Sequence, residues 1–232
     1  MSVTAGARSF SYRDVARSGP PVDASPIAWE GAGETVAARY ERSRPARLHR
    51  YDIAFTSTGG FAYETPLRTE AADDRDSARW LAGRYEYRRR WFSKVLPDWI
   101  DAGIGAQAIG GTLSMTRHAE PALESHEHDV WIGGAGVLSA RLQRWRRLAI
   151  EATWANGIRI AHTSISRPAA DGAAEGVGPG WLTDTAVRAD VALTARASIV
   201  VEYAWTGEGL LSTHHGYAFS TGGIVAGVRY GR

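Results

Sequence analysis

The chain has 232 residues, 44% of them hydrophobic and 22% charged, and its 27 Lys and Arg against 25 Asp and Glu give a net charge of +2. No window approaches the roughly 18 consecutive apolar residues of a membrane-spanning helix, and the balanced charge excludes a broadly basic surface for nucleic acid. Cysteine is absent, which excludes disulfides and thiolate metal sites.

The length suits one all-β domain, so residues 1–232 are treated as a single domain. The first ten residues, "MSVTAGARSF", lack the charged and apolar regions of a secretory signal. This fits either a cytosolic chain or the mature form of an exported chain with an added Met.

Apolar and polar residues alternate with a period of two through most of the chain, which is typical of amphipathic β-strands. We expect an opening strand near residues 10–17. The alternation is clearest, in chain order, in residues 49–55, 81–88, 148–160, 187–205 and 221–230.

The connections between these strands fall into two alternating classes. Short connections are expected near residues 43–47, 93–97, 144–147 and 195–198. Long polar connections are expected near residues 18–25, 67–77, 118–129, 166–180 and 207–220. An even number of strands with one short-looped end and one long-looped end is typical of transmembrane β-barrels. The pattern predicts an antiparallel up-and-down meander of about ten strands, with eight as the alternative, and both termini at the short-turn end.

Tryptophans mark both ends of the predicted strands. Four of them follow long loops at intervals of about 50 residues, namely Trp29, Trp80, Trp131 and Trp181. A second group, Trp91, Phe92, Trp99 and Trp145, lies beside the short turns. Aromatic residues at both ends of an apolar band match the two interfacial girdles of a membrane barrel. Because Trp29, Trp80 and Trp131 fall on the charged face, we expect them to fill the long-loop mouth and to be candidate binding residues.

The two faces of the strands differ in a way that indicates which one meets lipid. The apolar face mixes large side chains with Gly and Ala, which lipid tolerates better than a close-packed interior does. The charged face is rich in Arg rather than Lys, which suits a confined network of Arg–carboxylate pairs. The predicted network in the lumen includes Arg84, Glu86, Arg188, Asp190 and Glu202. Arg196 is expected on the same face.

In its alternation, its loop asymmetry and its closing strand "GGIVAGVRYGR", the chain resembles bacterial outer-membrane β-barrel proteins over essentially its whole length. The resemblance implies a transmembrane β-barrel in a bacterial outer membrane, surrounded by lipid and lipopolysaccharide. It also implies long loops available to a protein partner. No cofactor, metal or nucleic acid is expected.

The stretch "RIAHTSIS" is the sharpest candidate for chemistry. His162 and Ser164 share one strand face near the long-loop end. The pair resembles the H-x-S element of outer-membrane lipid A deacylases, which implies His162 as base and Ser164 as nucleophile, with Glu175 as the acid that orients the base. The alternative is a His and a Ser that merely lie in the polar interfacial zone.

Two further groups of histidines lie in predicted loops. Residues 126–129, "HEHD", and residues 214–215, "HH", offer imidazole and carboxylate groups that suit transition metals. Their spacing is not diagnostic, so solvated loop histidines are the favoured interpretation. Omptin-type proteases are also ten-stranded barrels, but no omptin motif matches this sequence.

The sequence favours a non-enzymatic envelope protein with a structural, surface-interaction or ligand-binding role and a narrow, charge-filled lumen. The leading alternative is a lipid A or phospholipid acyl hydrolase that uses His162 and Ser164. A small-solute channel is the third hypothesis, and a soluble ligand-binding barrel with inverted faces is the fourth.

Overall fold

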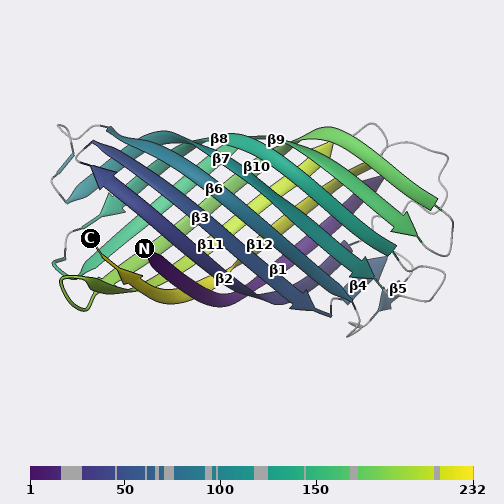
Figure 1. The fold of residues 1–232 in the computed structure, drawn as a ribbon, viewed down its shortest axis with the longest axis horizontal. Coiled ribbons are helices and arrows are strands. Elements are labelled where there is room, and N and C mark those ends of the chain that lie inside the picture. The colour runs from purple at the N-terminus through teal and green to yellow at the C-terminus, as the bar shows by residue number, and fades with distance from the viewer. Residues whose placement is uncertain are drawn as a thin grey trace.

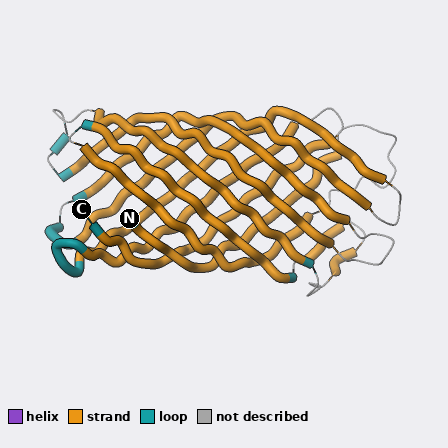
Figure 2. Tube along the Cα trace, viewed as in Figure 1, coloured by secondary structure: helices purple, strands orange, loops and turns teal. Residues whose placement is uncertain are grey.

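The computed structural model is a cylinder of tilted β-strands (Figures 1 and 2). It describes residues 1–16, 28–44, 46–60, 62–65, 68–70, 76–91, 96–97, 99–117, 125–143, 145–167, 172–211 and 215–231. The strands are β1 (Ser2–Ala16), β2 (Ala28–Arg44), β3 (Arg47–Gly59), β4 (Ala62–Thr65), β5 (Arg68–Glu70), β6 (Ser77–Trp91), β7 (Ile100–Arg117), β8 (Ser125–Leu142), β9 (Leu148–Arg167), β10 (Gly172–Ala192), β11 (Ala197–Leu211) and β12 (His215–Tyr230).

Ten of these strands close on themselves to form an antiparallel barrel, which confirms the predicted fold. The closure is made by β1, which pairs with β2 on one side and with β12 on the other, so that Ser2 lies opposite both Arg39 and Arg229. Every other barrel strand pairs with its neighbours in chain order. Both termini lie at the end of the barrel that carries the short turns (Figure 1). Within the described residues, no helix is long and apolar enough to cross a membrane.

The long-loop end differs from the prediction in four places, and at one of them residues 125–129, expected in a long loop, belong to β8. The connection between β3 and β6 contains the short hairpin β4–β5. Residues 166–180 and 207–220, expected as long loops, are mostly strand, because β9 and β10 pair from Arg167 opposite Gly172 onward and β11 and β12 pair from Leu211 opposite Gly216. These segments read as loops because they are interrupted by several glycines, so the alternation that marks a strand is lost.

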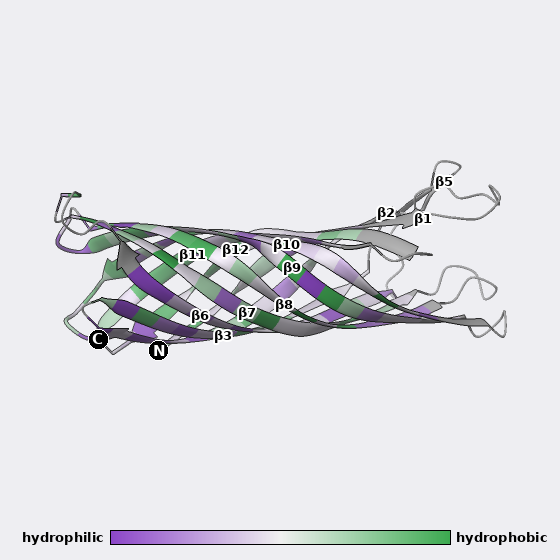
Figure 3. Ribbon diagram, turned by 90° about the horizontal axis from the view of Figure 1, so that it is seen from above, coloured by the Kyte–Doolittle hydropathy of each residue, from purple (hydrophilic) through white to green (hydrophobic). Residues whose placement is uncertain are grey.

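The outer face of the barrel is apolar and the inner face holds the charges, as predicted. Exposed side chains such as Ile132, Ile158, Ile224 and Val228 have exposed fractions of 59–75%. Arg188 and Glu202, by contrast, are 4% and 8% exposed. Hydrophobic and hydrophilic residues accordingly alternate along the strands (Figure 3). Inverting the faces, as a soluble barrel requires, is incompatible with this arrangement.

Arg196 is an exception to the predicted pattern. The turn between β10 and β11 spans residues 193–196, where the chain was expected to turn at 195–198, and Arg196 is exposed in it. Its carbonyl accepts a hydrogen bond from the Gly231 amide. The prediction that this side chain faces the lumen is wrong, because the turn ends the strand before the alternation reaches it.

An aromatic cluster lies on the outer face near the short-turn end. Tyr51 contacts Tyr40 and Tyr85, with ring centroids 6.1 and 5.0 Å apart. Trp99 and Trp145 are exposed at the same end. Together they form the girdle expected where a membrane barrel meets the interface.

Candidate functional site

The half of the lumen toward the short turns is filled by ion pairs. Arg39 joins Asp52 on the neighbouring strand to Glu202 across the barrel, with N–O distances of 2.6 Å to each. Arg188 pairs with Asp190 at 3.1 Å and lies 4.0 Å from Glu202. All five of these side chains are at most 16% exposed. Such charge-assisted bonds fix the side chains in place.

Arg50 is the centre of this lumenal ion-pair network. Its Nη2 lies 2.7 Å from an oxygen of both Glu41 and Glu151, and its Nη1 lies 3.6 Å from Glu86. Glu151 also accepts a hydrogen bond from Arg88 at 2.6 Å, and Arg88 pairs with Glu86. The carboxylates come from β2, β6 and β9, so the network ties together strands that are not neighbours.

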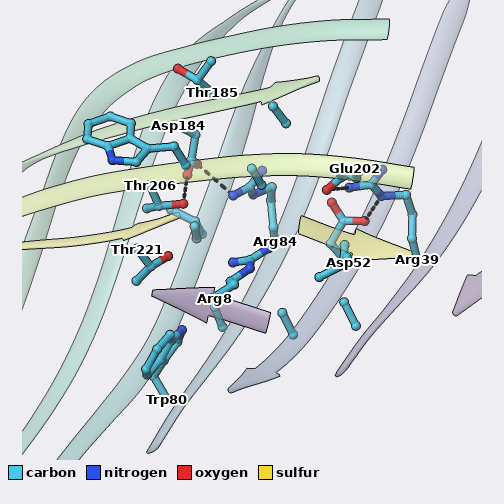
Figure 4. A pocket seen from close by; sticks show the side chains of 18 of the residues that line it. Arg8, Arg39, Asp52, Trp80, Arg84, Asp184, Thr185, Glu202, Thr206 and Thr221 are labelled. Atoms are coloured by element: carbon cyan, nitrogen blue, oxygen red, sulfur yellow. Dashed lines mark hydrogen bonds and ion pairs between the residues drawn. The ribbon is translucent and has the colours of Figure 1, made fainter. Parts of the chain in front are cut away.

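A small cavity of about 110 Å³ lies above the network, near the middle of the lumen. Figure 4 shows its polar wall, where Arg84 lies 2.8 Å from Asp184 and Thr206 donates a hydrogen bond of 2.6 Å to the same carboxylate. Arg8 points into the cavity from β1, beside Trp80. The cavity is large enough for several ordered waters or for one small solute.

Toward the long-loop end the lumen is closed by a cluster of apolar side chains, which we call the aromatic plug. Its rings include Phe10, Trp80 and Phe219, with centroids 5.7–6.4 Å apart. Leu113 and Met115 pack into the same cluster, and both are 2% exposed. The aromatic plug lies between the ion-pair network and the long-loop mouth, with buried charges such as Asp129 and Glu208 on the strands beside it.

Trp80 and Trp131 point into the barrel, and each is 8% exposed. Arg159 lies over the Trp131 ring at 5.4 Å and is paired with Glu208 at 2.8 Å. Trp131 fits because Gly111 faces it, where a Cβ would lie 2.8 Å from the indole. The side chain of Trp29 lies outside the described residues. Their binding role remains a prediction.

The predicted lumenal residues Arg84, Glu86, Arg188, Asp190 and Glu202 all have partners inside the barrel. Sequence reasoning missed several further inward residues. These are the aromatic plug on β1, β7 and β12 and the polar residues Gln107, Glu127, Asp129, Asp184 and Glu208. The inward orientation of Asp184 could have been predicted, because it lies four positions before Arg188 on β10 and therefore shares its face.

The candidate catalytic residues lie on the outer face, near the long-loop end of β8, β9 and β10. Glu175, which the sequence placed in a loop, is in β10 directly opposite Ser164. His162 Nε2 is 4.0 Å from a carboxylate oxygen of Glu175. On the other side of Ser164, the register places His128 opposite it. The structure thus brings the three predicted residues together on one patch and adds His128.

This patch lies at the edge of the apolar band that is nearer the long loops. His162 lies in register between Val130 and Val177, which are 47% and 66% exposed. One step further out, the row consists of His128, Ser164 and Glu175. Apolar side chains therefore give way to polar ones between these two rows of the outer face.

The histidines of residues 126–129 are in β8 rather than in a loop, contrary to the prediction. His128 Nδ1 is 2.9 Å from Ser114 Oγ, and His126 Nδ1 is 3.2 Å from Thr116 Oγ1. In the part of the chain that the structure describes, no group of three or more His, Asp or Glu side chains is arranged to hold a metal ion. The side chains of His214 and His215 lie outside the described residues.

A closed antiparallel barrel with an apolar exterior, an aromatic girdle and a charged interior has the fold of bacterial outer-membrane β-barrel proteins. No family model and no curated protein sequence matches the chain.

Among solved structures, the chain is similar to the outer membrane protease OmpT from Escherichia coli, at 12% identity over 100% of this chain and 95% of that one, with a TM-score of 0.72. The translocator domain of the autotransporter NalP from Neisseria meningitidis gives 9% identity, covers 99% and 88% of the two chains, and has a TM-score of 0.43. The OmpT likeness supports the barrel architecture.

Proposed function

We propose that the chain is a non-conducting barrel of a bacterial outer membrane, with termini and short turns in the periplasm and the long-loop end outside. Its role is structural or lies in interactions of the long-loop end with a ligand or protein partner. The observation that supports this proposal is that side chains close the lumen. The aromatic plug and the ion-pair network occupy successive layers of the interior, and the cavity between them has a volume of only about 110 Å³.

A conductance measurement tests the closed lumen. The purified protein inserted into a planar bilayer is expected to leave the membrane current unchanged, because hydrated ions cannot pass layers of packed and ion-paired side chains. Insertion is verified separately by flotation of the protein with liposomes, because a variant that removes only the plug would leave the ion-pair network in place. Discrete channels from the unmodified protein would overturn the proposal in favour of a small-solute channel.

The outer-face patch supports a second candidate, an acyl hydrolase acting on outer-leaflet lipids. In this scheme Ser164 Oγ attacks the acyl carbonyl while His162 accepts its proton and passes it to the leaving alcohol, and water then releases the fatty acid. Glu175 orients His162 and stabilises its protonated form. The observation that favours this candidate is the register that places Glu175 opposite Ser164, within 4.0 Å of His162.

The hydrolase proposal predicts release of fatty acid from lipopolysaccharide or phospholipid vesicles. Ser164→Ala should lower the rate at least 100-fold, as expected when a nucleophile is lost. Ser166→Ala is the matched control, since Ser166 is exposed on the same strand face two positions further out. Unchanged lipids after incubation with the unmodified protein would exclude this activity.

A further inference from the structure

A polar side chain lies within the apolar outer face of the barrel. Asn156, the single asparagine of the chain, is exposed on β9. On the same face, its neighbours along the strand are Trp154 and Ile158, which are 45% and 75% exposed. Its position between two apolar side chains places the carboxamide inside the lipid-facing band, away from headgroups and water.

Within the described part of the chain, the Asn156 carboxamide makes no hydrogen bond to another residue. Across the sheet, the register places it between Gly136 and Thr183. Lipid tails offer neither donors nor acceptors, so an unpaired amide at this depth is unfavourable. A partner that supplies both a donor and an acceptor would remove this cost.

The surface beside Asn156 has room for such a partner. Four small exposed residues form a low area of the outer face on β7 and β8, which we call the shelf. Within it, Ala106 lies opposite Gly136 and Ala108 lies opposite Gly134. A Cβ added at Gly136 would meet no atom within 4 Å, so the space above the shelf is open. Ile132 and Ile158 project at its edge, with exposed fractions of 69% and 75%.

We propose that this face of β7, β8 and β9 is the contact between two copies of the barrel in the membrane. A carboxamide both donates and accepts, so two Asn156 side chains related by a two-fold axis can hydrogen-bond to each other. The projecting isoleucines of one copy can then enter the shelf of the other, and small residues allow the close approach that packing in lipid requires. This face can therefore pack against the same face of a second copy. Neither contact with lipid nor the proposed function requires that property.

The chain contains no cysteine, which makes cross-linking a direct test. Gly136→Cys places a thiol next to the proposed axis, in space that the structure leaves open. Val36→Cys on β2 is the control, because Val36 is 54% exposed on the far side of the barrel. In vesicles, oxidation is expected to give a disulfide-linked dimer from Gly136→Cys and only monomer from Val36→Cys.

Asn156→Leu tests the role of the carboxamide, since leucine suits a lipid-facing position and should preserve the barrel. Sedimentation in detergent should show an association constant about tenfold lower than that of the unmodified protein, and Asn156→Gln should recover part of the loss. Equal cross-linking at the two cysteine positions, a monomeric unmodified protein, or association unaffected by Asn156→Leu would overturn the proposal.

Discussion

Replacing Arg50 by methionine is expected to destabilise the barrel by about 3–5 kcal/mol, the usual effect of removing one partner from a buried charge network. Arg50 is 4% exposed and is the shared partner of Glu41, Glu86 and Glu151. Without it, three carboxylates face one another with fewer cations between them. Guanidinium-induced unfolding of the protein in detergent micelles, followed by tryptophan fluorescence, measures the loss.

The matched control for this variant is Arg146→Met, because Arg146 is exposed in the turn between β8 and β9. It should change stability by no more than about 0.5 kcal/mol. Arg50→Lys should fall between the two, since lysine keeps the charge but lacks the fork that reaches several carboxylates. If Arg50→Met and Arg146→Met gave equal stabilities, the lumenal network would not hold the strands together.

Placing a charge on the outer face should show how deep each residue lies in the membrane. Ile224 is 59% exposed on β12, and Ile224→Arg is expected to cost about 2–4 kcal/mol in vesicles, as arginine does near the midplane of a lipid-facing barrel wall. On a water-exposed surface the same substitution would change stability by about 0.5 kcal/mol at most. Denaturant titration of folding into vesicles distinguishes the two values.

Tyr230 provides the control for depth, because it lies on the same strand and face at the short-turn end and is 67% exposed. Tyr230→Arg should cost only about 0–1 kcal/mol, the value for a charge close to the interface. A cost that is the same at the two positions would show that the outer face does not experience a gradient from hydrocarbon to water.

Which face of a strand points outward and which points into the lumen could be predicted wherever one face was apolar and the other charged. Arg188 and Glu202 alternate with valine and tyrosine along their strands, and they lie opposite each other inside the barrel. The count of ten barrel strands followed from the alternation of short and long connections.

Trp80 was expected inside the barrel, but the contribution of β7 to the aromatic plug could not be predicted, because β7 is largely apolar on both faces. Ile104 and Ala106 point outward while Leu113 and Met115 point inward, so the period of two disappears. The parts of β9 to β12 that extend beyond the apolar band toward the long loops were also missed, because there neither face shows a regular apolar pattern. Glu175 and Glu208 lie in glycine-rich segments that read as loops, and only the pairing of neighbouring strands makes them strand residues.

The central claim is that the apolar outer face contacts lipid, and extraction without detergent tests it most directly. Folded protein is expected to remain with the membrane fraction in salt and alkaline washes and to leave it only in detergent. Once detergent is removed, it should aggregate unless lipid is supplied, because the outer face exposes a continuous band of Ile, Val, Leu and aromatic side chains. A monodisperse monomer in plain buffer would contradict the account.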